Sequence, residues 1–172
     1  MLYVRSDVGG LFKLIDSPTL HWKQLLDSTI SVENKNLFGI ESIALGKINN
    51  ALSLTYSLLQ DPTNSSVLYA ATGMYLDSGP SDIMRSEDGG VTWKGTGLRN
   101  VPMGGNEYFR WAGERLAIDS LNPNIIYFGS RLTGLWRSVD RAATWHRVDS
   151  FPVNGTSPYG INFVQKIGRA HV

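Results

Sequence analysis

The chain has 172 residues, no cysteine and a formal net charge of +1, from 16 Lys and Arg against 15 Asp and Glu. The scattered basic residues argue against nucleic acid as a partner, and no apolar run is long enough to cross a membrane. Because cysteine is absent and His21, His146 and His171 lie far apart in the sequence, we expect no metal site and no cofactor.

The first predicted element is a strand that enters a turn of polar and glycine residues. It reads Tyr3-Val4-Arg5-Ser6-Asp7-Val8-Gly9-Gly10 and leads into an apolar strand and Trp22. Short polar side chains followed by glycines are typical of hairpin turns. From these residues alone Asp7 has two interpretations, a cap of its own turn or a carboxylate with a chemical role, and the first is the more common. We expect Trp22 to lie in the core.

A 15-residue interruption comes next, from Gly46 to Gln60. Removing it joins Ala44-Leu45 to Asp61 and restores a match with residues 117–127, which read as strand, polar turn and strand. Because Gly46-Lys47 can be encoded by a splice-donor sequence, we interpret the interruption as a retained intron. A natural surface insertion is the alternative. We expect residues 46–60 to be exposed and loosely attached, while residues 61–69 form a strand.

Two copies of one pattern follow, 52 residues apart, at residues 83–93 and 135–145. Each reads apolar, any, Arg, Ser, any, Asp, any, small, any, Thr, Trp. This is the Asp-box, a hairpin turn in which Ser and Asp side chains satisfy backbone N–H groups. Trp93 and Trp145 are expected to be buried over their turns. A repeat of roughly 40 to 50 residues with four short strands is a propeller blade, so we predict an all-β fold of about three blades.

A glycine-rich stretch with several aromatic residues lies between the two Asp-boxes. Its candidate binding residues are Asn106, Tyr108, Phe109, Arg110 and Trp111. The aromatic rings either bind a ligand or pack between blades, and Arg110 has Glu107 and Glu114 as alternative partners.

The last six residues, Ile167–Val172, are what a common sequencing adapter encodes, and we set them apart as artificial. The predicted domain therefore covers residues 1–166. It is an incomplete propeller, because closing the ring takes typically 4 to 8 blades.

Seven further motifs follow one another in a specific order. They are Arg5–Gly10, Gly39–Ala44, Leu68–Gly73, Met103–Asn106 with Arg110, Gly113–Leu116, Phe128-Gly129 and Gly134–Trp136. In this order they resemble glycoside hydrolase family 74, the xyloglucan-cleaving endoglucanases. The resemblance implies two facing seven-bladed propellers, of which this chain covers part of the N-terminal one. It also implies cleavage of the β-1,4-glucan backbone of xyloglucan with inversion.

The resemblance assigns roles to individual residues. Asp7 matches the N-terminal catalytic aspartate of the family, and we assign it the role of base. Inversion needs a second carboxyl group as acid. In the family that group lies in the second propeller, so this chain alone is expected to be nearly inactive. Asn106, Tyr108, Arg110 and Trp111 are the implied substrate-binding residues.

The resemblance further implies an extracellular, monomeric parent protein whose partner is xyloglucan or a related β-glucan. Two glycosylation sequons, at Asn64 and Asn154, are compatible with secretion. Two alternatives stay open: a non-catalytic Asp-box propeller that binds proteins, and a sialidase. A sialidase needs an arginine triad and a Tyr nucleophile, which we cannot assign here.

Overall fold

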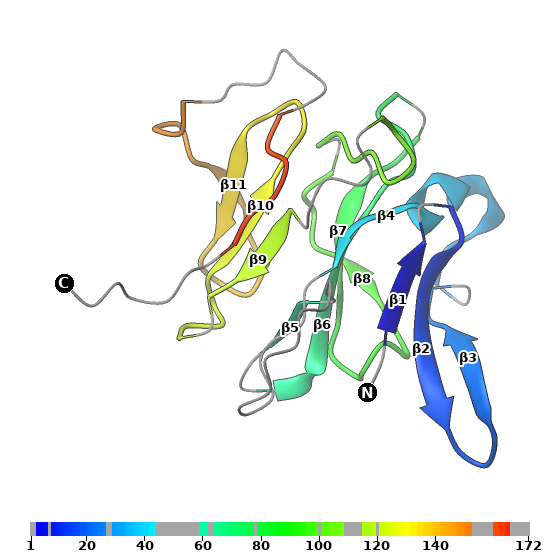
Figure 1. Cartoon of the computed structure of the whole chain (residues 1–172). Helices are drawn as coiled ribbons and strands as arrows, with labels where there is room; N and C mark the ends of the chain where they lie inside the picture. The colour runs from blue at the N-terminus through cyan, green and yellow to red at the C-terminus, as the bar shows by residue number, and fades with distance from the viewer. Residues whose placement is uncertain are drawn as a thin grey trace.

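The computed structural model describes residues 3–6, 8–26, 29–43, 59–61, 64–77, 79–99, 101–108, 115–119, 121–152 and 160–165. These residues form twelve β-strands and one 3-10 helix, arranged as three antiparallel sheets (Figure 1). The prediction of an all-β fold of about three blades is confirmed.

Each sheet is built from strands that follow one another along the chain. The first contains β1 (Tyr3–Ser6), β2 (Gly10–Asp16) and β3 (Leu20–Gln24). The second contains β4 (Ile40–Ile43), β5 (Leu59–Asp61), β6 (Asn64–Thr72), β7 (Asp82–Ser86) and β8 (Lys94–Gly95). The third contains β9 (Leu116–Ile118), β10 (Ile126–Gly129), β11 (Leu135–Ser138) and β12 (His146–Arg147). Short meandering antiparallel strands of this kind are the blades of a propeller.

Each of the three sheets has a tyrosine at the same position, where it lies opposite a basic residue of the next strand. The pairs are Tyr3 with Lys13, Tyr69 with Arg85 and Tyr127 with Arg137. Strands β1, β6 and β10 are therefore equivalent. In the second sheet β4 pairs with the other edge of β6, and in the third sheet β9 pairs with the other edge of β10. In the first sheet, whose order is β1-β2-β3, no strand pairs with the other edge of β1 among the described residues. The first sheet thus corresponds to the outer three strands of a blade.

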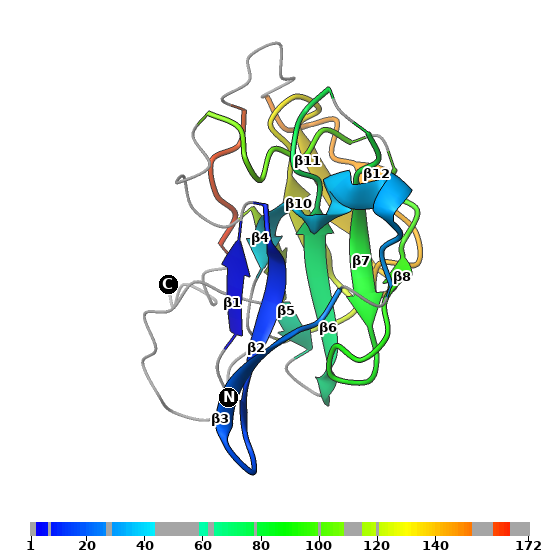
Figure 2. The ribbon, with the colours of Figure 1, turned by 90° about the vertical axis from the view of Figure 1, so that its right-hand side faces the viewer.

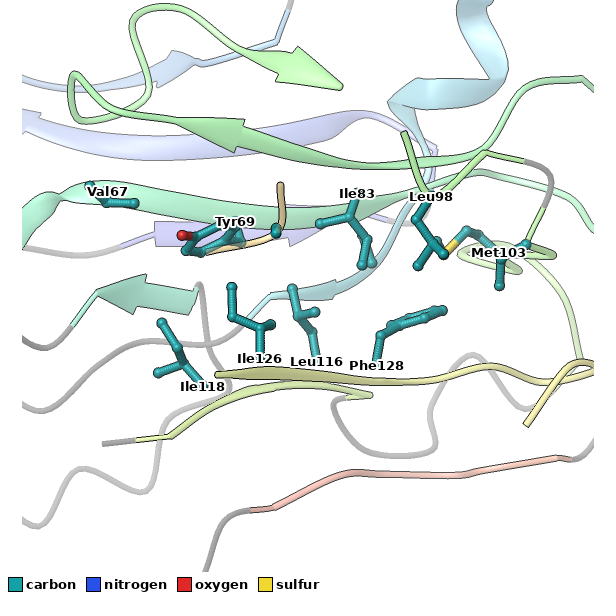
Figure 3. Packing of buried hydrophobic residues seen from close by; sticks show 12 residues of the cluster. Val67, Tyr69, Ile83, Leu98, Met103, Leu116, Ile118, Ile126 and Phe128 are labelled. Carbon is teal, nitrogen blue, oxygen red and sulfur yellow. The ribbon is translucent and has the colours of Figure 1, made fainter. Parts of the chain in front are cut away.

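The core lies between neighbouring sheets. Strand β6 is buried on both faces: Tyr69 points toward the third sheet and Leu68 toward the first. Figure 3 shows the first of these layers, where residues of the second sheet such as Ile83 meet Ile126 and Phe128 of the third. Alternate residues of one central strand therefore join all three sheets into a single packed stack.

The Asp-boxes form the predicted turns. In the first, Asp88 accepts hydrogen bonds from the backbone N–H of Thr92 (2.9 Å) and from its hydroxyl (2.6 Å), and the Ser86 hydroxyl donates to Asp88 (2.8 Å). In the second, Asp140 accepts from the N–H of Thr144 at 2.8 Å. Both boxes thus use the Asp side chain to satisfy their own backbone, as the sequence predicts.

The box tryptophans pack as expected, but Trp22 does not. Trp93 is buried and Trp145 is partly buried, with its indole N–H donating to the Thr96 hydroxyl of the preceding sheet. Trp22 is 48% exposed, so its assignment to the core is wrong. It lies inside β3 rather than directly after a box turn, and Leu25 and Leu26, just beyond β3, are the buried residues of this segment.

The interruption ends in a strand. Leu59 and Gln60 belong to β5 and lie opposite Tyr69 and Leu68 of β6. The expectation of loose attachment is therefore wrong for these two residues, and residues 46–58 lie outside the described residues. The predicted strand at 61–69 is also shifted, because β6 begins at Asn64 and Asp61 belongs to β5.

Candidate functional site

Several loops meet at the end of the sheets where β1 and β6 terminate (Figures 1 and 2). We call residues 36–40, 73–76 and 104–108, together with the turn after β1, the rim. Backbone hydrogen bonds join the segments 36–40, 73–76 and 104–108 to one another. Gly73 donates to Gly39 (2.7 Å), and Gly105 donates to Gly73 (2.9 Å). The helix η1 (Val32–Phe38), which connects the first two sheets, delivers the segment 36–40 to this place.

Equivalent positions in the three blades follow the strands β1, β6 and β10. Four residues after the matched tyrosines come Asp7, Gly73 and Arg131, within two residues of the end of β1, β6 or β10. Gly73 and Arg131 both contact the segment 104–108. Asp7 itself lies outside the described residues, and only its neighbours can be placed.

The turn after β1 differs from the Asp-box turns. The Ser6 hydroxyl oxygen accepts from the N–H groups of Gly9 (3.0 Å) and Val8 (3.4 Å), and the Gln24 amide donates to the Gly9 carbonyl (2.7 Å). In the Asp-boxes the carboxylate comes two residues after the Ser, a position that Val8 fills here. The carboxylate at position 7 therefore does not stand where an Asp-box needs one.

Strand β1, which leads into this turn, and the segment 104–108 approach the same residue. The Arg5 guanidinium donates to the carbonyl of Ile40 (3.2 Å). On the other side, a Cβ added to Gly105 would come within 3.1 Å of the Ile40 backbone. Ile40 is therefore contacted both by an arginine of β1 and by the segment 104–108. The position of Asp7 on this rim stays a prediction.

Two of the four predicted substrate-binding residues can be placed, and both lie on the rim. The Asn106 amide donates to the Tyr75 hydroxyl (2.9 Å). Tyr108 is 77% exposed, and its backbone carbonyl accepts a hydrogen bond from Arg131. Arg110 and Trp111 lie outside the described residues, as does Phe109.

Sequence analysis missed three residues that build the rim: Asn36, Tyr75 and Arg131. Asn36 is buried, accepts from the Tyr75 N–H (3.1 Å) and donates to the Pro80 carbonyl (3.0 Å). Arg131 is 1% exposed and donates to the Gly104 carbonyl (3.0 Å). The signal that could have found Arg131 is its position, four residues after Tyr127, which corresponds to that of Asp7 after Tyr3.

A cavity of about 280 Å³ borders the rim and is lined by residues that include Asn34, Pro80, Asp82 and Arg99. Burial raises the pKa of the Asp82 carboxyl, while the Arg99 guanidinium, 3.8 Å away, lowers it in part.

The described residues contain no group of three or more His, Cys, Asp or Glu side chains able to hold a metal ion. They also contain no helix long and apolar enough to cross a membrane.

No family model matches the chain. A xyloglucanase from Acetivibrio thermocellus is 39% identical over 167 residues, which are 95% of this chain and 18% of that protein. A xyloglucanase from Hypocrea jecorina is 40% identical over 158 residues, 90% of this chain and 17% of that protein. The crystal structure of the GH74 xyloglucanase from Xanthomonas campestris superposes with a TM-score of 0.71 at 34% identity, covering 87% of this chain and 19% of that one. The chain belongs to glycoside hydrolase family 74.

The chain thus spans less than a fifth of the length of these family 74 relatives. The ordered motifs that suggested the family coincide with places where rim backbones touch. A Cβ on Gly39 would lie 2.3 Å from the Cα of Met74, and one on Gly73 would lie 2.5 Å from the Cβ of Met103. Several family 74 motif glycines are therefore needed for close packing of the rim.

Proposed function

We propose that this chain supplies part of the substrate groove of a secreted, inverting endo-β-1,4-glucanase that hydrolyses the backbone of xyloglucan. Asp7 is the general base. Asn106, Tyr108, Arg110 and Trp111 bind the sugar chain. This proposal extends the activity of the similar family 74 proteins, which are xyloglucanases, to the longer protein of which the chain is a part.

The observation that carries the proposal is the difference between the turn after β1 and the Asp-boxes. Asp88 and Asp140 each bind their own turn. In the turn after β1 the Ser6 hydroxyl accepts from turn N–H groups as the box serines do, but Val8 stands in the place of the box aspartate and the Gln24 amide donates to the Gly9 carbonyl. By its spacing Asp7 is not the aspartate of an Asp-box, which favours a chemical role for it, and the residues at the equivalent positions, Gly73 and Arg131, contact the segment 104–108.

Inversion divides the work between two carboxyl groups roughly 6.5 to 9.5 Å apart, one that activates water and one that protonates the leaving oxygen. Asp7 as base takes a proton from the water that attacks the anomeric carbon. The acid comes from a part of the protein outside this chain, so the chain alone binds substrate without appreciable turnover. The rim side chains orient the glucan so that water approaches from the face opposite the leaving group.

The test compares Asp7→Ala with Asp88→Ala in the full-length protein that contains this chain. Asp7→Ala is expected to lower kcat on xyloglucan by about 10³-fold or more with the melting temperature preserved, as loss of a general base does. Asp88→Ala is expected to lower the melting temperature with kcat nearly unchanged. Full turnover by Asp7→Ala refutes the assignment. Rescue of that variant by azide, with release of an α-glycosyl azide, would add direct support for its role as base.

A further inference from the structure

The rim carries an aromatic side chain that the family motifs do not single out. Tyr75 follows β6 and lies beside the segment 104–108, where the Asn106 N–H donates to the Met74 carbonyl at 2.8 Å. Its side chain is 38% exposed. A tyrosine held at the surface beside Asn106 and the highly exposed Tyr108 needs an explanation, because large aromatic residues are usually buried.

Tyr75 is fixed from both ends by residues of other segments. The Asn36 side-chain oxygen accepts from the Tyr75 backbone N–H (3.1 Å), and the Asn106 side-chain amide donates to the Tyr75 hydroxyl (2.9 Å). Asn36 is itself buried and also bonds to Pro80. The ring is therefore held in one orientation before any ligand arrives, which lowers the entropy lost on binding.

The groups known to surround Tyr75 are polar. Asp77, two residues further along the chain, is exposed, and Glu107 accepts a hydrogen bond from the Leu76 N–H at 3.3 Å. A fixed aromatic face with amide groups beside it is suited to a neutral ligand that offers an apolar face and hydroxyl groups at its edge. A pyranose ring has these properties, since its axial C–H bonds form an apolar face.

We propose that Tyr75 is a stacking residue for a sugar ring of the substrate, and that Asn106 acts in part as a positioning residue that holds Tyr75. This inference rests on the proposed function and adds a specificity-determining residue to the groove. Asn36 has the same positioning role from the backbone side. The exposed polar groups of the rim then bind the hydroxyl groups at the edge of the sugar ring.

The experiment titrates the 172-residue chain with xyloglucan oligosaccharides and follows binding by NMR. Tyr75→Ala is expected to weaken binding about tenfold or more, whereas Tyr75→Phe stays within about threefold, because the ring is kept and only the hydroxyl is lost. In the wild-type chain the Tyr75 ring protons are expected to shift on addition of sugar. The matched control is Trp22→Ala, which removes an exposed aromatic side chain from β3, away from the rim, and is expected to leave binding unchanged.

The outcomes separate this inference from the proposed function. If the wild-type chain binds the sugar and Tyr75→Ala binds it with equal affinity, the stacking role alone is overturned. The same follows if the ring protons of Tyr75 do not shift when the wild-type chain binds. Absence of any binding by the folded wild-type chain overturns the proposed function and this inference with it. If Tyr75→Ala fails to fold, the ring-proton shifts and the Tyr75→Leu variant decide the question.

Discussion

The guanidinium of Arg131, at the end of β10, donates to the carbonyl oxygen of Gly104 at 3.0 Å and so connects the third sheet to a loop of the second. The same group donates to the carbonyl of Tyr108. Arg131 is 1% exposed, so the segment 104–108 rests on a buried cation. The segment that carries two of the proposed sugar-binding residues therefore depends on a neighbouring blade for its position.

Arg131→Ala is expected to lower the free energy of unfolding by about 3 kcal/mol, because two carbonyl groups lose a buried charged donor and a cavity remains. The matched control is Arg147→Ala. Arg147 pairs with Asp149 at 2.9 Å in an exposed ion pair, and such pairs contribute about 0 to 1 kcal/mol. Urea unfolding followed by circular dichroism measures both variants. Equal losses in the two would show that Arg131 does not hold the loop.

The Asp-boxes predict a specific sensitivity to acid. Hydrogen bonds from Thr144 hold the pKa of Asp140 at about 2, and those from Thr92 hold the pKa of Asp88 well below its usual range. A carboxyl whose pKa is lower in the folded state stabilises the protein above its ordinary pKa, and this stabilisation is lost as pH falls through the folded value. The melting temperature of the wild-type chain is therefore expected to fall between about pH 4 and pH 2.

The variant Asp140→Asn tests this acid dependence. It is expected to melt a few degrees lower than wild type at pH 6, with a smaller further loss on going to pH 2. Asp16→Asn, at an exposed position of β2, serves as control and is expected to follow the wild-type curve. Parallel curves for wild type and Asp140→Asn would contradict the role of the carboxylate in the box.

For Asp82 we predict the opposite dependence of folding stability on pH. Asp82 is 5% exposed, one of its carboxyl oxygens is buried without a hydrogen-bond partner, and burial raises the pKa of the carboxyl. A group whose pKa is raised on folding contributes stability below its ordinary pKa, and this is lost as pH rises through the folded value. Asp82→Asn is therefore expected to raise the free energy of unfolding at pH 7 by about 1 kcal/mol and to have less effect at pH 3. A loss of stability at pH 7 would show that the charged form is needed, through Arg99 or another group.

The features predicted correctly from the sequence depend on neighbours in the chain. An Asp-box joins Ser, Asp and Thr within seven residues, so its hydrogen bonds follow from the pattern itself. Arg131 could not be found in this way, because Gly104 and Tyr108 lie 27 and 23 residues away. Trp22 was misplaced because a tryptophan after a turn is not sufficient for burial. Its place within β3 decides its exposure, and that place depends on strand register.

The roles of Asp7, Arg110 and Trp111 stay predictions, since these residues lie outside the described part of the chain. The register of β1 shows that Asp7 follows the strand equivalent to β6 and β10. The sequence pattern could not establish this, because a turn of Ser, Asp and Gly does not by itself show which two strands of a blade it joins.

The interruption gives the last prediction. Ile43 of β4 lies opposite Ala70, and the next two places along β6, opposite Tyr69 and Leu68, are taken by Leu59 and Gln60 of β5. In the third blade a single strand, β9, occupies the corresponding positions along β10, with Ala117 opposite Tyr127 and the buried Ile118 opposite Ile126.

Deletion of residues 46–60 joins Leu45 directly to Asp61. Ala44 and Leu45, which follow Ile43, are then expected to extend β4 into the two places that Leu59 and Gln60 hold. An apolar side chain then replaces Gln60 at the position equivalent to Ile118, and the entropy cost of closing a 15-residue loop, about 2 kcal/mol, is removed. We expect the free energy of unfolding to rise by roughly 1 to 3 kcal/mol, measured by urea unfolding. The deletion combined with Leu45→Gln is the matched control and should lose much of the gain, because it restores a polar residue at that place. A deletion variant less stable than the original chain would show that residues 46–60 are a natural part of the blade and not a retained intron.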